Sequence, residues 1–88
     1  MNHKHRKALH ALFAHPISGN LSMKDVEHVL KDLGAELRHA NGGKIAVTLA
    51  GHTAHFHEHG HSLGKDEVVQ LRKFVETCGI DPARDYPL

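Results

Sequence analysis

The chain has 88 residues, with 11 Lys and Arg against 10 Asp and Glu, so its formal charge of +1 indicates no particular partner. This length allows one domain. No apolar run approaches the roughly 20 residues that cross a bilayer, no apolar signal-peptide core follows the basic start, and Cys78 has no second cysteine to pair with. We therefore expect a cytoplasmic protein that does not enter a membrane.

The hydrophobic periodicity divides the chain into six elements. In chain order these are predicted as helices over 3–14 and 23–33, strands over 35–40, 44–50 and 53–59, and a helix over 65–78. The second helix has the clearest boundaries, because Ser22 is a typical N-cap and Gly34 a typical C-terminal stop. Between the second and third strands, Gly51-His52 is predicted as a two-residue hairpin loop.

This order predicts an α+β fold, α-α-β-β-β-α, in which helices cover one face of a three-stranded antiparallel sheet. We expect it to occupy residues 1–79 as a single domain, followed by an irregular tail over 80–88. The other face of the sheet is then open. Alternation along the third strand sends Ala54 and Phe56 to the core, and the open face receives His55, His57 and His59.

Histidine is the unusual part of the composition, with 11 of 88 residues. Since free imidazole has a pKa near 6.5, half-protonation would raise the net charge to about +6 or +7. The charge is also uneven, because no acidic residue precedes Asp25, whereas Lys4, Arg6 and Lys7 do. These three are candidate contacts for a phosphate backbone. The alternative is a solvated helix face that is basic without a function.

The histidines of the third strand permit two kinds of chemistry. Alternate residues on a strand lie about 6.5–7 Å apart, so two imidazoles can converge on a metal such as zinc or nickel, and Glu36 is expected to share their face. The same imidazoles can instead transfer protons in RNA cleavage, with Lys44 or Arg38 stabilising the developing phosphorane charge. The third interpretation is that they are polar surface residues. Proton transfer needs no cofactor, and no paired cysteines support a zinc site.

Several short segments point to a family when taken together. The most specific is the run Phe-Ala-His-Pro-x-Ser-Gly-Asn at residues 13–20. The others are residues 4–9, 25–27 and 33–36, the glycine turn at 42–43, and Phe56-His57. Over about residues 4–79, these segments resemble a longer branch of the HicA toxin family.

The resemblance implies a domain similar to the double-stranded-RNA-binding fold, an endoribonuclease that cleaves mRNA, and a HicB-like antitoxin as partner. In that family a histidine entering the second strand is catalytic, and Lys44 occupies its position here. Lysine binds phosphate but transfers protons poorly at neutral pH. The predicted catalytic residues are therefore His57, His55 and His59. The predicted RNA contacts are Lys44, Arg38, Lys4, Arg6 and Lys7. The alternative is a non-catalytic domain that binds a protein, or a metal through His55, His57, His59 and Glu36.

Overall fold

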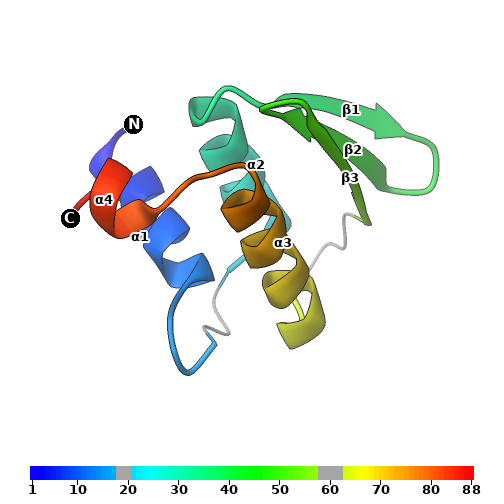
Figure 1. Ribbon diagram of the computed structural model, residues 1–88. Helices are drawn as coiled ribbons and strands as arrows, with labels where there is room; N and C mark the ends of the chain where they lie inside the picture. Colours follow the sequence, from blue (N-terminus) through cyan, green and yellow to red (C-terminus); the bar gives the residue numbers. More distant parts are fainter. Residues whose placement is uncertain (18–20, 58–62) are drawn as a thin grey trace.

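Three antiparallel strands in the order β1-β2-β3 form an open sheet, and helices pack against one of its faces (Figure 1). This is seen in a computed structural model that describes residues 1–17, 21–57 and 63–88. The elements are α1 (His3–Leu12), α2 (Met23–Asp32), β1 (Glu36–Ala40), β2 (Lys44–Leu49), β3 (His52–His57), α3 (Lys65–Thr77) and α4 (Pro82–Asp85). The predicted α+β class and the order α-α-β-β-β-α are confirmed, with α4 as an addition. Within the described residues, no helix combines the length and the apolar character that crossing a membrane requires.

Helix α2 has the boundaries that its sequence predicts. The Ser22 hydroxyl accepts a hydrogen bond from the backbone N–H of Asp25 at 3.2 Å, which satisfies one of the free donors of the first turn. Gly34, just beyond the helix, has a φ of +98°, a conformation that glycine adopts at little cost. Val29 and Leu30 are buried because helical spacing brings the apolar residues to one side.

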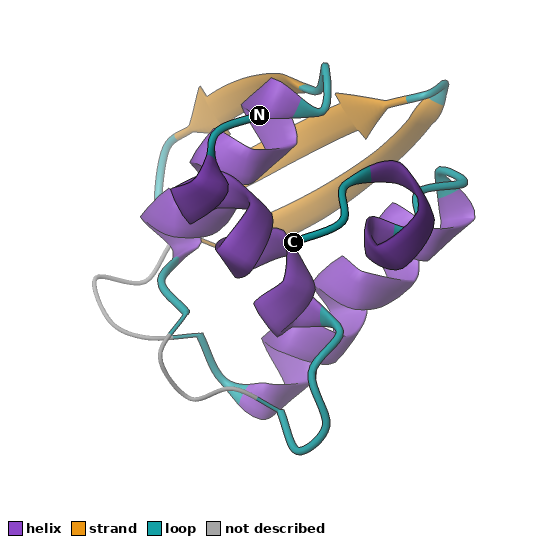
Figure 2. Cartoon of the chain, turned by 90° about the vertical axis from the view of Figure 1, so that its left-hand side faces the viewer, coloured by secondary structure: helices purple, strands orange, loops and turns teal. Residues whose placement is uncertain are grey.

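Helix α1 lies on the side of the helical layer away from the sheet (Figures 1 and 2). It contacts α2, α3 and α4, and Leu9 and Leu12 on its inner side are fully buried. Asn2 caps its start by accepting a hydrogen bond from the N–H of His5 at 2.8 Å. The sheet and α1 are therefore on opposite sides of α2 and α3.

The turn between β2 and β3 differs from the prediction by one residue. Ala50 and Gly51 form the loop, with φ angles of 52° and 81°, and Leu49 pairs with His52. Positive φ at both central positions is the pattern of a type I′ turn, whose twist matches that of the flanking strands. The predicted loop had glycine at its first position, which suits a type II′ turn. Strand β3 consequently begins at His52, and Ala54 lies opposite Val47 rather than Leu49.

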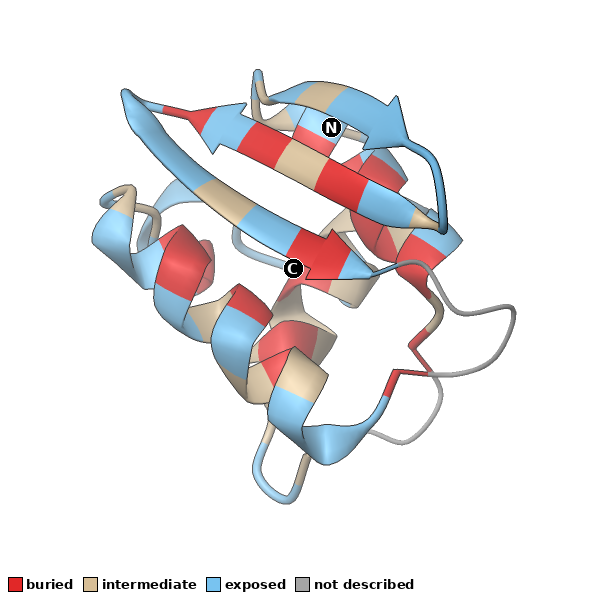
Figure 3. Cartoon of the chain, turned by 90° about the vertical axis from the view of Figure 1, so that its right-hand side faces the viewer, coloured by how far each residue is buried: buried red, intermediate tan, exposed pale blue. Residues whose placement is uncertain are grey.

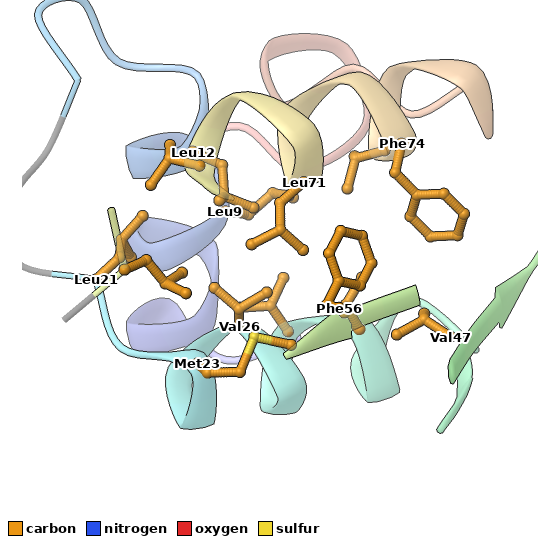
Figure 4. Packing of buried hydrophobic residues seen from close by; sticks show 14 of the residues in the cluster. Leu9, Leu12, Leu21, Met23, Val26, Val47, Phe56, Leu71 and Phe74 are labelled. Carbon is orange, nitrogen blue, oxygen red and sulfur yellow. The ribbon is translucent and has the colours of Figure 1, made fainter. Parts of the chain in front are cut away.

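The core lies between the sheet and helices α2 and α3, and it continues between these helices and α1 (Figure 4). Alternation along β2 buries Ile45, Val47 and Leu49 (Figure 3). Phe56 on β3 packs against Phe74 on α3 in an edge-to-face arrangement, with ring centroids 6.0 Å apart. The buried hydrophobic residues form one cluster: Leu9, Leu12, Leu21, Met23, Val26, Val29, Leu30, Ile45, Val47, Leu49, Phe56, Leu63, Val68, Leu71, Phe74 and Val75.

The tail over 80–88, expected to be irregular, contains the short helix α4. The Asp81 carboxylate accepts a hydrogen bond from the N–H of Ala83 at 3.0 Å, and Pro82 occupies the first turn. An N-cap carboxylate followed by proline is a typical helix start. Pro82 is buried and α4 contacts α1, so this part of the tail packs onto the helical layer.

Candidate nucleic-acid interface

The open face of the sheet carries the side chains that alternate with the core residues. Strand pairing places Arg38, Ala46 and His55 in one cross-strand row and Ala40, Lys44 and His57 in the next. Four of these residues are both exposed and basic. We call them the basic face: Arg38, Lys44, His55 and His57. The predicted exposure of the third-strand histidines is thus confirmed for His55 and His57, and His59 lies outside the described residues.

Lys44 lies directly opposite His57 across β2 and β3. Residues in this relation have Cβ atoms about 4.5–5.5 Å apart. The predicted hairpin loop would have placed His57 opposite Ala46 instead. A two-residue slip in pairing keeps each side chain on the same face but changes its neighbours. The observed register therefore gives His57 a lysine beside it, which the sequence alone did not indicate.

Arg38 has an acidic neighbour on its own strand. Its guanidinium Nη2 lies 3.3 Å from Glu36 Oε1, and the two side chains are 80% and 65% exposed. An ion pair this exposed contributes at most about 1 kcal/mol, so Arg38 can exchange it for a phosphate at little cost. Among the open-face positions of the three strands, Glu36 is the acidic one and the remainder are small, polar or basic.

The strand pairing keeps Glu36 apart from the two described histidines of the alternative metal site, whose third histidine, His59, lies outside the described residues. Glu36 belongs to the row of Thr48 and Thr53, two strands away from β3, so it does not converge with His55 and His57. Within residues 1–17, 21–57 and 63–88, no group of three or more His, Cys, Asp or Glu side chains is placed to hold a metal ion.

The predicted RNA contacts on α1 are separated from the basic face. Lys4 and Lys7 are exposed and Arg6 is half-buried. Because α1 lies across α2 and α3 from the sheet (Figure 1), these three residues form a second basic surface. The structure does not combine the two sets into one contact surface.

A pocket of about 580 Å³ opens at the edge of the sheet, between the end of β3 and the start of α3. It adjoins the basic face because both open-face histidines take part in its wall. Its lining is His55, Phe56, His57, Gly64, Lys65, Asp66, Glu67 and Gln70. The acidic residues Asp66 and Glu67 suit the positive N-terminus of α3. The pocket itself forms only because β3 lies beside that helix, and no local sequence pattern predicts that β3 and α3 are neighbours.

His39 and Glu27 form a partly buried link between β1 and α2 that the sequence pattern did not indicate. Glu27 is only 7% exposed, and its Oε1 lies 2.5 Å from Nε2 of His39. A glutamate within a helix is usually exposed to solvent. Glu27 can be buried because His39 on β1 supplies a hydrogen-bond partner for its carboxylate.

Two other histidines connect parts of the helical layer. The Nδ1 atom of His5 on α1 is hydrogen-bonded to Oδ2 of Asp32 on α2. The Nε2 atom of His10 lies 2.8 Å from the carbonyl oxygen of Tyr86, so it ties the C-terminal tail to α1. These two histidines therefore hold α1 to α2 and to the C-terminal tail.

The single thiol is not an activated nucleophile. Partial burial raises the pKa of Cys78 above its usual value, and its Sγ donates a hydrogen bond to the carbonyl of Leu49 at 3.3 Å. A reactive cysteine requires a lowered pKa.

Comparison of the chain with models of protein families, with curated proteins and with solved structures found no match. The HicA resemblance therefore stays a prediction from the sequence. The described residues form a basic sheet face with two imidazoles, one lysine and one arginine, and a pocket at its edge.

Proposed function

We propose that the chain binds RNA through the basic face. The observation that carries this proposal is the register of the sheet, which places Lys44 opposite His57 and puts Arg38 and His55 in the adjoining row. Exposed basic side chains on neighbouring strands of one sheet face suit the repeating charge of a phosphodiester backbone. Apart from the histidines, no aromatic side chain points to the open face of β1–β3. This favours contacts to phosphate and sugar over base stacking on the sheet.

We further propose that the two open-face histidines cleave the bound strand. One imidazole accepts the proton of a ribose 2′-hydroxyl while its oxygen bonds to the adjacent phosphorus. The bond from phosphorus to the 5′-oxygen breaks, and the second imidazole protonates that oxygen. The products are a 2′,3′-cyclic phosphate and a 5′-hydroxyl. Lys44, opposite His57, can stabilise the negative charge that develops on the phosphorane oxygens.

With the sequence resemblance, these roles describe a HicA-like toxin component. Its target is then mRNA in the cytoplasm, and its partner is a HicB-like antitoxin that covers the basic face. An acidic or hydrogen-bonding partner surface would suit the same four residues that we assign to RNA, because both ligands would complement exposed positive charge.

Fluorescence anisotropy with a labelled single-stranded RNA tests the binding proposal. We expect the affinity to fall steeply between 50 and 200 mM salt, because each neutralised phosphate releases counterions. We also expect it to rise between pH 8 and pH 6, as histidines gain charge in this range. An affinity that is independent of both salt and pH would contradict the proposal. Detection of 2′,3′-cyclic phosphate ends by mass spectrometry tests the cleavage separately.

A further inference from the structure

The lining of the pocket at the edge of the sheet combines one aromatic residue, Phe56, with mostly polar residues. Phe56 is 7% exposed and is held by its contact with Phe74, so its position in the lining is fixed by the core. His55 and His57 flank it along β3, and the first turns of α3 form the opposite wall. A volume of about 580 Å³ lies within the usual range of about 300–1,000 Å³ for small-ligand pockets, which leaves room for one nucleotide.

The wall formed by α3 presents a specific pattern of hydrogen-bonding groups. Asp66 and Gln70 are four residues apart on the helix, so they project from the same side, and both line the pocket. Glu67 also lines it, but its Oε1 accepts a hydrogen bond from the N–H of Gly64 at 3.3 Å and so caps the helix. The wall thus offers the two acceptor oxygens of Asp66 and the amide of Gln70, which can donate.

We propose that this pocket binds the guanine base of an unpaired nucleotide in the RNA, an inference that rests on the proposed RNA-binding function. Guanine presents two neighbouring donors, N1–H and the N2 amino group, which match both oxygens of the Asp66 carboxylate. Its O6 accepts from the Gln70 amide. Adenine presents a lone pair at N1, which repels a carboxylate, and uracil and cytosine each present one donor on this edge. Guanine is therefore the base whose edge this wall complements.

The position of the pocket relative to the basic face supports the same ligand. His55 and His57 belong to both, so a nucleotide whose base enters the pocket has its phosphates beside His57 and Lys44. Lys65 at the start of α3 also lines the pocket and adds a second cation near the sugar and phosphate. The base in the pocket would then position the adjacent phosphodiester against the two imidazoles.

The test compares labelled six-nucleotide RNAs that consist of uridine except for one central G, A or C. For the unmodified chain, we expect the G oligomer to bind about tenfold more tightly than the A oligomer, the effect of one bidentate contact. Asp66→Asn should abolish this ratio, because its amide presents a donor to a guanine donor. Gln70→Ala should reduce it.

Glu76→Gln is the matched control, because it removes the same charge from an exposed position ten residues further along the same helix. It should leave the ratio of G to A affinity unchanged, and circular dichroism checks that all variants are folded. A ratio near one for the unmodified chain, or a ratio that Asp66→Asn leaves intact, would overturn the guanine pocket while RNA binding itself stands. If none of the oligomers binds at low salt, the proposed RNA-binding function fails instead.

Discussion

Three histidines each form a hydrogen bond between two elements of the fold. His5 bonds to α2, His10 to the C-terminal tail, and His39 on β1 to α2. On the open face, His55 and His57 are exposed on a strand whose neighbour supplies Lys44. The first group bonds to carboxylates or to a carbonyl within the fold, and the second belongs to the basic face.

The difference lies in the surroundings of the imidazole and not in the residue type. The histidines of the first group connect elements that are distant in sequence, such as β1 and α2, and their replacement should affect stability. Those of the open face lie where alternation along β3 directs them away from the core, and their replacement should affect binding and cleavage. These histidines therefore fall into two groups, and mutation can distinguish them by whether stability or RNA binding is lost.

The largest expected effect is on cleavage. His57→Ala should lower the rate of RNA cleavage by a factor of about 10²–10⁴, the usual contribution of a general acid or base. His52→Ala is the matched control on the same strand, because His52 is exposed but alternates with the open-face positions. The rate of cyclic-phosphate formation in single-turnover assays measures both. Equal losses in the two variants would remove the special role of the open-face position.

The next largest effect is on stability, and here the variant of the histidine inside the fold should lose more than the variant of the open-face histidine. His39→Ala leaves the Glu27 carboxylate buried without its partner, which costs about 1–3 kcal/mol of unfolding free energy. His55→Ala removes a histidine from an exposed strand position and should change stability by less than about 0.5 kcal/mol. Urea denaturation measures both.

A double variant sharpens this result. Replacing Glu27 by Leu together with His39→Ala should recover part of the lost stability, because an apolar side chain of similar size no longer needs a hydrogen-bond partner. If His39→Ala and His55→Ala destabilise the fold equally, the division into structural and surface histidines is wrong.

The smallest expected effect is on the pH dependence of stability, through Asp85 in the C-terminal tail that His10 connects to α1. Hydrogen bonds from the Arg84 guanidinium, and secondly from the backbone N–H of Asp81, lower the pKa of Asp85 to about 2. Because this folded-state pKa is below the usual value of 3.8, the stabilisation is complete above about pH 4. It is lost as the pH falls towards 2.

Thermal melts of the unmodified chain and Asp85→Asn follow this contribution. The difference between their melting temperatures should be constant from pH 5 to 7 and shrink from pH 4 to 2. A difference that stays constant down to pH 2 would mean that the ion pair of Arg84 and Asp85 does not form in solution.

Local patterns predicted much of the fold. The cap at Ser22, the stop at Gly34 and the alternation along β2 depend on residues close in sequence. The exposure of His55 and His57 follows from the corresponding alternation along β3. These features need only the periodicity of a strand or helix and a few end signals.

The parts that the sequence did not predict depend on tertiary contacts. The hairpin loop sits one residue earlier than its glycine suggested, and this register places Phe56 opposite Ile45 and lets it pack on Phe74. The burial of Glu27 depends on His39 from another element. Amphipathic spacing showed that α1 has a buried side but not that it lies across the helical layer from the sheet.

One pair of variants tests directly whether the open sheet face, and not α1, binds RNA. Arg38→Gln with Lys44→Gln removes two positive charges from the basic face, and Lys4→Gln with Lys7→Gln removes two from α1. Anisotropy with the same labelled RNA across a range of salt measures both affinity and its salt dependence. We predict that the first double variant loses at least tenfold in affinity and that its slope of log K against log salt falls by about 1.4–1.8, the value for two phosphate contacts. The second should lose less than threefold. A larger loss for the α1 variant, or equal losses for both, would show that the basic face is not the main RNA-binding surface.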